Sequence, residues 1–159
     1  MSEEERITMA HGSGGEATEK LIGEIFARQF RNPYLSQMED STLVPGPGSG
    51  RIAMTTDSFV VTPVEFPGGD IGRLCVCGTV NDLLMSGAEP RYLTCGFILE
   101  EGLGISQLQR IVHSMAETAK EAGVSIVAGD TKVVENHSGP EGGLVINTAG
   151  VGFLPKNRT

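Results

Sequence analysis

The chain has 159 residues, a length that suits one domain with a real hydrophobic core, and apolar residues make up 39% of it, which argues against global disorder. Twelve basic and twenty acidic residues give a net charge of -8, which argues against electrostatically driven nucleic-acid binding. That charge leaves room for a phosphate ligand held by backbone amides and a divalent cation.

The sequence predicts a cytoplasmic protein without membrane or nucleic-acid partners. No apolar run approaches the roughly 20 residues that span a bilayer. The acidic, polar start MSEEERITMA lacks the basic and apolar regions of a signal peptide. Cys75, Cys77 and Cys95 are an odd number in such a chain, so they are interpreted as reduced thiols.

The first part of the chain predicts one helix, one strand and two irregular stretches. Apolar residues at helical spacing predict a helix over 15–30, and β-branched and apolar residues predict a strand over 51–61. The intervening 31–50 is expected to be a long connection that contains an exposed PGPGSG turn. Residues 62–70 are expected to be a loop, because two prolines interrupt any strand ladder there.

Residues 71–90 are ambiguous, and their length favours a helix over a strand. On such a helix one face carries mostly small side chains, namely Cys75, Gly78, Thr79, Asp82 and Ser86. Small residues on one face let another backbone approach the helix closely.

The second half of the chain alternates strand and helix. Strands are predicted over 91–100, 124–134 and 144–155, and the clearest helix over 104–123, with Ser106 as its N-cap. The buried stripe expected of that helix comprises Leu108, Ile111, Val112, Met115, Ala119 and Ala122. This order of elements predicts an α+β domain with one four-stranded sheet and its helices on one side.

Four aspartates sit at the edges of these elements, in the segments MEDSTLV, TTDSF, VNDLLMSG and AGDTKVV: Asp40, Asp57, Asp82 and Asp130. Isolated carboxylates are seldom buried unless they are paired or bound to a metal. Mg²⁺ prefers hard oxygen ligands and takes a few carboxylates together with substrate phosphate. Each aspartate alone is explained more simply as a turn or helix cap, but the four together with a glycine loop favour a Mg-nucleotide site.

The stretch AHGSGGEATEK places a glycine-rich run, Gly12, Ser13, Gly14 and Gly15, directly before the first predicted helix. A helix N-terminus offers free amides to an anion. The run is not a Walker A loop, because no Gly-Lys-Ser/Thr follows, and not a dinucleotide fingerprint, because no strand precedes it. As a lone motif it is weak, and a plain helix entry explains it more simply.

Three other polar features are weaker candidates. Cys75-x-Cys77 has neither a second pair nor nearby histidines, so small buried side chains explain it better than zinc. His11 adjoins the glycine run and is placed to touch a ligand. Lys132 follows Asp130 by two residues and shares its strand face. Two interpretations are open: the Lys132 charge faces a phosphate, or Lys132 forms an ordinary ion pair with Asp130.

Several segments together resemble a known family. In chain order from about residue 7 to the end, AHGSGGEAT, TTDSFVVTPVEFPGGDIGRL, NDLLMSGAEPRYL, CGFILEEGL and AGDTKVV are similar to the HypE family of hydrogenase-maturation proteins. That family belongs to the superfamily of aminoimidazole ribonucleotide synthetase, selenophosphate synthetase and thiamine-monophosphate kinase. FPGGDIGRL and CGFILEEGL point to the HypE family rather than to its relatives.

The resemblance implies carbamoyl dehydration. Family members use ATP to convert a carboxamide on their own C-terminal cysteine into a thiocyanate, and the cyano group then goes to the iron of nickel–iron hydrogenase. ATP and Mg²⁺ are the implied cofactors, and the carbamoyltransferase and iron-scaffold proteins of hydrogenase maturation are the implied partners. The implied fold is a mixed, mainly antiparallel sheet that pairs with a second copy into a barrel-like homodimer.

Carried over by position, the resemblance assigns roles to individual residues. Asp40, Asp57, Asp82 and Asp130 match positions that hold Mg-phosphate, and Gly12, Ser13, Gly14 and Gly15 match the glycine loop near the phosphates. Asn81 and Thr131 stand beside two of these aspartates and are further candidates for nucleotide binding. Lys132 matches a polar position near the expected path of the tail and is the candidate catalytic residue.

Length is the departure from the family pattern. Family members run to about twice this length and end in a tail with a terminal cysteine, whereas this chain ends at Thr159. Residues 1–159 are expected to be the N-terminal ATP-binding and dimerisation domain, without the C-terminal domain and cysteine tail, and inactive alone. Two alternatives stay open: a small-molecule kinase or synthetase of the same superfamily, and a non-catalytic dimerisation module for hydrogenase-assembly partners.

Overall fold

The computed structural model describes residues 5–156. The chain divides into two compact units, residues 1–39 and residues 40–159, and each is described by itself. Within the described range, none of the helices combines the length and apolar character that a bilayer crossing needs.

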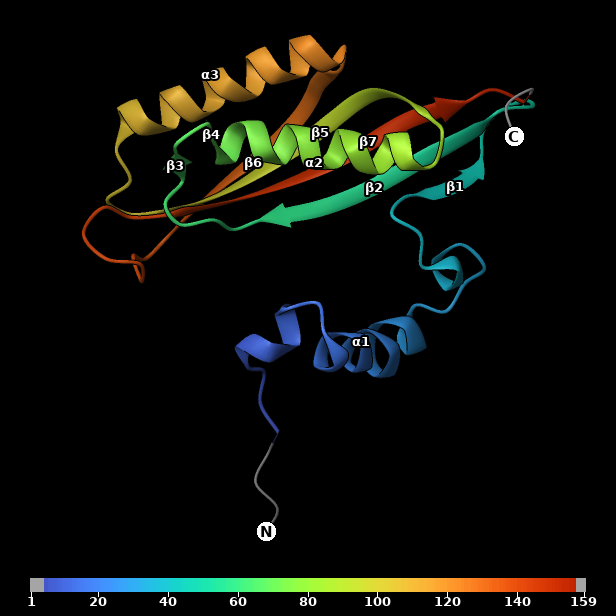
Figure 1. The fold of residues 1–159 in the computed structure, drawn as a ribbon, viewed down its shortest axis with the longest axis horizontal. Helices are drawn as coiled ribbons and strands as arrows, with labels where there is room; N and C mark the ends of the chain where they lie inside the picture. The colour runs from blue at the N-terminus through green and yellow to red at the C-terminus, as the bar shows by residue number, and fades with distance from the viewer. Residues whose placement is uncertain (1–4, 157–159) are drawn as a thin grey trace. The chain divides into compact units, whose positions relative to one another are not determined.

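The first unit is a short helical segment (Figure 1). The 3-10 turn η1 (Met9–Gly12) precedes helix α1 (Glu16–Leu21), which continues into the wider π-type turn η2 (Ile22–Ala27), and the 3-10 turn η3 (Leu35–Gln37) follows. The helix predicted over 15–30 is therefore confirmed in position. None of these four elements has a buried residue, so their apolar side chains lie at the surface of the unit.

The second unit is built on a five-stranded sheet (Figure 1). Its strands are β1 (Thr42–Pro45), β2 (Arg51–Phe59), β5 (Glu89–Glu100), β6 (Ser125–Val134) and β7 (Leu144–Leu154). They lie in the order β1-β2-β7-β5-β6, and all neighbours are antiparallel except the parallel pair β5 and β6. The α+β class and the mixed, mainly antiparallel sheet are confirmed.

The predicted count of four strands is wrong, because β1 lies in the stretch expected to be a connection. This strand has four residues, pairs with β2, and forms the edge of the sheet next to it. The PGPGSG turn joins the two strands, and Gly46 N–H donates to the Gly50 carbonyl at 3.0 Å. A strand this short, flanked by prolines and glycines, shows too little alternation to be recognised without its partner.

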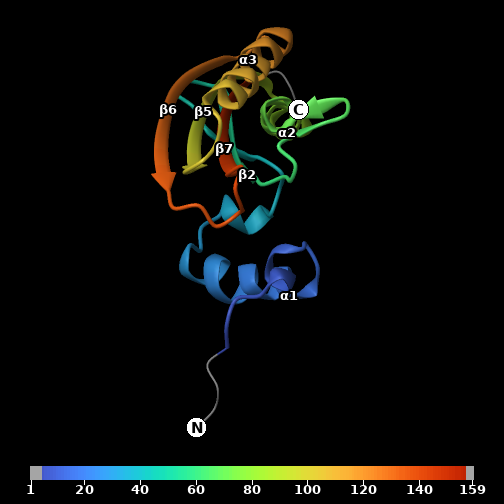
Figure 2. The same cartoon turned by 90° about the vertical axis from the view of Figure 1, so that its left-hand side faces the viewer.

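Both long helices cover the same face of the sheet, as predicted. Helix α2 (Ile71–Met85) packs on β2 and β7, and helix α3 (Ile105–Ala122) connects the parallel strands β5 and β6. Figure 2 shows the two helices side by side on one side of the sheet. Parallel neighbours require such a crossover, so α3 is what allows β5 and β6 to pair.

The stripe predicted for helix α3 is confirmed in part, since Ile111, Met115 and Ala119 are buried and Leu108 packs, partly buried, against the core. The buried residues of the helix are Ile111, Met115, Thr118 and Ala119. Val112 and Ala122, expected in the stripe, are exposed, because they lie beyond the arc of the helix that faces the sheet and α2. The N-cap is Gly104 rather than Ser106, since the first helical residue is Ile105.

A small hairpin occupies the segment that two prolines mark as a loop. Strand β3 (Glu65–Phe66) pairs with β4 (Gly69–Asp70), and Pro67 lies in the turn, where a missing amide costs no ladder bond. Arg110 of α3 holds the hairpin through an ion pair with Glu65, N to O 2.8 Å. The loop prediction for this segment is therefore corrected at four residues.

The core lies between the helices and one face of the sheet. Its largest fully buried side chains include Ile71, Leu83, Leu93, Ile111 and Ile146. Strand residues that alternate with the core residues point to the other face, which neither α2 nor α3 covers. We call this surface the open face, and its exposed apolar side chains include Met54, Tyr92, Ile98 and Phe153.

Candidate functional site

Helix α2 begins at a cap that also fastens it to α3. The Asp70 carboxylate accepts hydrogen bonds from the Arg73 amide at 2.8 Å and from Ser114 Oγ of α3 at 2.9 Å. Gly72 lies so close to α3 that a Cβ there would collide with the Ile111 carbonyl oxygen. The cap and the glycine fix where α2 starts.

Two threonines and a glycine set α2 against the sheet. The hydroxyls of Thr79 and Thr148 share a hydrogen bond, and Thr148 Oγ1 also donates to a carbonyl oxygen of α2 at 3.1 Å. Gly78 faces the ring of Phe59, where a Cβ would lie 2.8 Å from a ring carbon. The close approach predicted for the small face of this helix is confirmed, and it turns Asp82, one helical turn after Gly78, toward β2.

Two of the four predicted aspartates, Asp40 and Asp57, act electrostatically on a third, Asp82. Asp40 precedes β1, Asp57 lies on β2 and Asp82 lies on α2. Asp57 is in register with Thr148, so its side chain leaves the sheet on the side that the helices cover. Partial burial raises the pKa of Asp82, and the negative charges of Asp40 and Asp57 raise it further. We call these three residues the acidic trio; a site that disfavours a further negative charge favours a cation.

The fourth aspartate, Asp130, lies apart from the trio. The row that starts at Asp57 crosses the sheet through Thr148, Cys95 and Gly129. Three strand spacings therefore separate Asp57 from β6, about 14 Å. Asp130 is the next residue after this row and alternates to the open face. Within one chain, the structure does not bring it to the trio.

Asp130 instead forms an ion pair with Lys132. The Lys132 Nζ lies 2.8 Å and 3.0 Å from the two carboxylate oxygens, and its hydrogen bond lowers the pKa of Asp130. Both side chains are largely exposed, so the pair adds little stability. The ion-pair interpretation of Lys132 is confirmed, and its catalytic role stays a prediction.

Asn81 and Thr131 also lie apart from the trio. Asn81 precedes Asp82 but lines a groove between α2 and α3, together with Cys77 and Thr118. Thr131 lies on the edge strand β6. Their assignment to nucleotide binding stays a prediction.

Ser41 is a polar residue beside the trio that the sequence reasoning missed. It is only 5% exposed, and within residues 5–156 its Oγ has no hydrogen-bond partner. Buried hydroxyls nearly always have a partner, so this one is unusual. Its position next to Asp40 in MEDSTLV was the available signal, but burial cannot be seen in a sequence.

The oxygens of this region suit a hard divalent cation. Carboxylates and hydroxyls are ligands that Mg²⁺ accepts, and the unpartnered Ser41 hydroxyl is a polar atom that a bound ion and its ligands would satisfy. In the part of the chain that the structure describes, no three His, Cys, Asp or Glu residues lie close enough to hold a metal as they stand. A cation would therefore have to draw the trio together, with phosphate oxygens completing its shell.

All three cysteines are free thiols. Burial raises the pKa of Cys75 to about 12, and its Sγ donates to the Gly72 carbonyl at 3.2 Å. Cys77 lies two residues further along the helix, so the two thiols do not face each other. This geometry supports small packed side chains at these positions rather than a zinc site.

The glycine run of the first unit is closed by Thr18. The Gly14 amide donates to Thr18 Oγ1 at 2.9 Å, and Gly14 has a positive φ of 83° that favours glycine. A Cβ at Gly12 or Gly15 would meet nothing within 4 Å. The run's own fold therefore explains only Gly14, and the glycines at 12 and 15 lie at the surface, where space is open.

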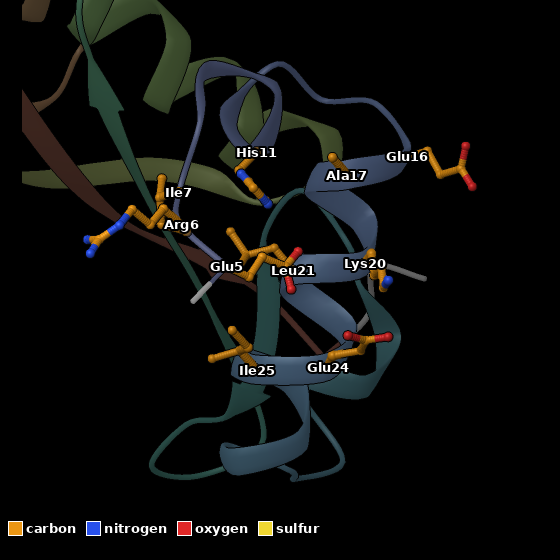
Figure 3. A pocket seen from close by; sticks show the side chains of 10 residues that line it. All are labelled: Glu5, Arg6, Ile7, His11, Glu16, Ala17, Lys20, Leu21, Glu24 and Ile25. Carbon is orange, nitrogen blue, oxygen red and sulfur yellow. The ribbon is translucent and has the colours of Figure 1, made fainter. Parts of the chain in front are cut away.

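His11 makes a local contact and lines a pocket in the first unit. Its Nδ1 accepts a hydrogen bond from the Thr8 amide at 2.9 Å. The pocket has a volume of about 470 Å³ (Figure 3), and its lining includes Ile7, Leu21 and Ile25 together with Arg6, Lys20, Glu5, Glu16 and Glu24. Charges of both signs surround it, so it has no clear preference for an anion, and we assign it no part in the phosphate site.

Comparison with known proteins identifies the family. Residues 38–154 match the family described as AIR synthase related protein, N-terminal domain. The carbamoyl dehydratase HypE of Escherichia coli K12 is 53% identical over 155 residues, which cover 95% of this chain and 46% of that protein.

Solved structures agree with this match. A HypE chain in a HypE–HypF complex has 57% sequence identity and a TM-score of 0.76, over 84% of this chain and 42% of that one. HypE in complex with ATP has 51% identity and a TM-score of 0.62, over 92% of this chain and 42% of that one. At 16% identity, thiamine monophosphate kinase from Aquifex aeolicus shares the fold alone.

The chain spans somewhat less than half the length of these relatives. The matched segment includes all five strands and both long helices of the second unit. It also includes the whole acidic trio. The chain belongs to the AIR synthase related family, whose N-terminal domain it carries, and it is similar to HypE over nearly all of its residues.

Proposed function

We propose that this chain supplies the Mg-ATP site of a carbamoyl dehydratase that acts in hydrogenase maturation. The observation that carries the proposal is the acidic trio, in which burial and then the charges of Asp40 and Asp57 raise the pKa of Asp82, in a chain similar to HypE. A HypE of 51% identity has been solved with ATP, which supports ATP as the nucleotide. Proteins of this sequence type carry the name carbamoyl dehydratase, which supports the reaction.

The proposed reaction removes water from an amide in two steps. The oxygen of a cysteine-bound carboxamide attacks the γ-phosphorus of ATP, the bond to ADP breaks, and the amide loses a proton. The phosphorylated oxygen then leaves as phosphate, the nitrogen loses its second proton, and a thiocyanate remains. Mg²⁺ would neutralise charge on the phosphates, and the trio would hold that ion.

The glycine run and four further residues keep the roles that the resemblance gives them. Gly12, Ser13, Gly14 and Gly15 would offer backbone amides to phosphate, and the space over Gly12 and Gly15 is open. Asn81 and Thr131 would contact nucleotide, Asp130 would bind Mg-phosphate, and Lys132 would take part in the chemistry. Because Asp130 and Lys132 lie on the open face, their roles require a ligand or a partner that reaches that surface.

We also propose that the open face is where two copies pair. Met54, Ile98 and Phe153 expose apolar surface on neighbouring strands, with exposed fractions of 50%, 45% and 39%. An apolar surface this broad is typical of an interface, and identical copies pair most simply about a twofold axis. The carbamoyltransferase and iron-scaffold proteins stay the proposed partners of the whole protein, and a solved HypE–HypF complex supports a maturation partner.

Calorimetric titration tests the nucleotide site. Mg-ATP is titrated into this chain, into Asp82→Ala, and into Glu117→Gln as a control that removes an exposed carboxylate from α3. We expect binding by the first and third proteins and none by Asp82→Ala. Binding that survives in Asp82→Ala, or a folded chain that binds no Mg-ATP, would contradict the proposal. The expectation that the chain does not turn over by itself stays a prediction, and ADP release in the same samples would test it.

A further inference from the structure

The residue that the proposed site leaves unexplained is Ser41. Its side chain is almost fully buried, and its hydroxyl has no hydrogen-bond partner within the described residues. Leaving a hydroxyl unpartnered in the interior disfavours folding, and an alanine would avoid that cost. A serine at such a position is explained if its partner arrives in another state of the protein.

The strand register places Ser41 on the side of the sheet that Asp57 faces and that α2, the helix carrying Asp82, covers. Leu43 pairs with Ala53, and both belong to a buried cluster under α2 that includes Leu83. Ser41 lies two residues before Leu43, so its side chain leaves the chain in the same direction. Extending the register by one pair sets Ser41 opposite Thr55. The Thr55 hydroxyl donates its hydrogen bond to the Asp40 carbonyl at 2.9 Å and does not pair with Ser41.

A carboxylate without a donor lies in the same neighbourhood. Asp82 follows Gly78 by one turn of α2 and faces β2, and Leu83 beside it packs on Ala53. Within residues 5–156, Asp82 accepts no hydrogen bond, although its side chain is partly buried. Ser41, with an unpartnered donor, and Asp82, with an unpartnered acceptor, are therefore both close in sequence to members of the Leu43, Ala53 and Leu83 cluster.

We propose that Ser41 is a positioning residue for the cation site: when a divalent cation binds the acidic trio, the Ser41 hydroxyl donates a hydrogen bond to the Asp82 carboxylate and holds it in the ligating orientation. This inference rests on the proposed Mg²⁺ site. Hydrogen bonds to ligating carboxylates fix their orientation, and their loss commonly weakens metal affinity about tenfold or more. The hydroxyl acts through Asp82 and does not itself touch the metal, because its oxygen is shielded from solvent.

The test compares metal affinity with stability in the metal-free protein. Mn²⁺ binding is measured by electron paramagnetic resonance and Mg²⁺ binding by competition, for the wild type and Ser41→Ala. Thermal melting is followed in chelator and in saturating Mg²⁺. Ser114→Ala, which loses a formed hydrogen bond to Asp70, is the control for an ordinary, partly buried serine that has its hydrogen-bond partner. Ser41→Cys keeps the side-chain volume and is the second variant if Ser41→Ala does not fold.

We expect Ser41→Ala to bind Mn²⁺ and Mg²⁺ about tenfold more weakly while melting at a higher temperature than the wild type in chelator. Ser114→Ala is expected to melt lower with unchanged metal affinity. In an Asp82→Asn background the Ser41→Ala effect on Mn²⁺ affinity is expected to disappear, because the two residues act as a unit.

Two results overturn the inference, and they are distinguishable. Unchanged Mn²⁺ affinity in Ser41→Ala, with a wild type that does bind, removes the role of Ser41 and leaves the Mg-ATP site standing. A folded wild type that binds neither Mn²⁺ nor Mg²⁺ removes the cation site and the role of Ser41 together.

Discussion

The hydroxyl groups of Thr79 and Thr148 form a hydrogen bond with each other where α2 packs on β7, and both residues are fully buried. Thr148→Val leaves the Thr79 hydroxyl without its acceptor in the interior, so we expect the free energy of unfolding to fall by about 1–3 kcal/mol. Replacing both threonines by valine removes the unpartnered group. The double variant should therefore lose less stability than the sum of the two single variants. Urea denaturation of the four proteins measures this, and strictly additive losses would contradict it.

Gly72 is the point of closest approach between α2 and α3. Alanine there is expected to destabilise the protein by about 1–3 kcal/mol, because its Cβ would overlap the Ile111 carbonyl and push the helices apart. Gly23→Ala is the matched control: a Cβ at Gly23 meets no atom within 4 Å, so alanine is expected to be harmless or mildly favourable. Thermal melts decide, and equal melting temperatures for wild type and Gly72→Ala would be the contrary result.

The raised pKa of Asp82 predicts a pH-dependent stability. Below its unfolded pKa, about 4, Asp82 is protonated in both states and costs nothing. As the pH rises from the unfolded pKa to the higher folded pKa, the unfolded state ionises before the folded state does. The folded state therefore becomes relatively less stable over this range. Asp82→Asn should therefore melt above the wild type at pH 7 and together with it near pH 3.

Asp130→Asn is the control for this pH dependence, because Lys132 lowers the pKa of Asp130. A carboxyl group whose pKa is lower in the folded state stabilises that state when the pH is above the unfolded pKa. This stabilisation is lost as the pH falls through the folded pKa. The melting temperature of Asp130→Asn should therefore match the wild type or lie slightly below it at pH 7. A rise like that expected of Asp82→Asn would contradict the electrostatic argument.

The open face predicts how the proposed homodimer is broken. Ile98→Asp or Phe153→Asp places a carboxylate in the middle of the apolar surface and is expected to shift the sedimentation coefficient from dimer to monomer. Val112→Asp, at an equally exposed site on α3, should leave the dimer intact. A wild type that sediments as a monomer at high concentration would remove the proposed interface.

The three thiols are expected to react with iodoacetamide in order of exposure. Cys77 is partly exposed, whereas Cys75 is fully buried with its pKa raised to about 12 by that burial. The thiolate is the reactive form, so at pH 8 mass spectrometry should find Cys77 modified first and Cys75 last. Early labelling of Cys75 would show that α2 leaves the sheet on the timescale of the reaction.

The sequence was informative wherever an element is long and its apolar residues are periodic. The four longer strands and both helices of the second unit lie where the periodicity places them. The fifth strand, β1, was missed because four residues hold too little pattern, and it exists because β2 pairs with it. Val112 was assigned to the buried stripe because an apolar side chain is indistinguishable by type from a core residue, and only packing decides.

The candidate site was predicted by residue type but not by grouping. Four aspartates look equivalent in the sequence, yet strand register places Asp130 three strand spacings from Asp57 and on the opposite face of the sheet. Proximity of Asp57 and Asp82 depends on how α2 is set against β2, which Gly78 controls. The only signal for Ser41 was its position next to Asp40, because an unpartnered hydroxyl is a property of burial and not of sequence.

Strand β6 ends the sheet, and all ten of its residues are exposed. Within the described sheet the outer edge of β6 has no neighbouring strand, and an open edge of this length can recruit the same strand of another molecule, while charged side chains on such an edge oppose uncontrolled pairing. Asp130 and Lys132 are the charged residues of β6, so we expect them to oppose edge-to-edge association of β6 strands in addition to any other role. We therefore expect replacement of Lys132 by a neutral residue to lower the amount of protein in solution, so any loss of activity has to be normalised to the fraction that stays in solution.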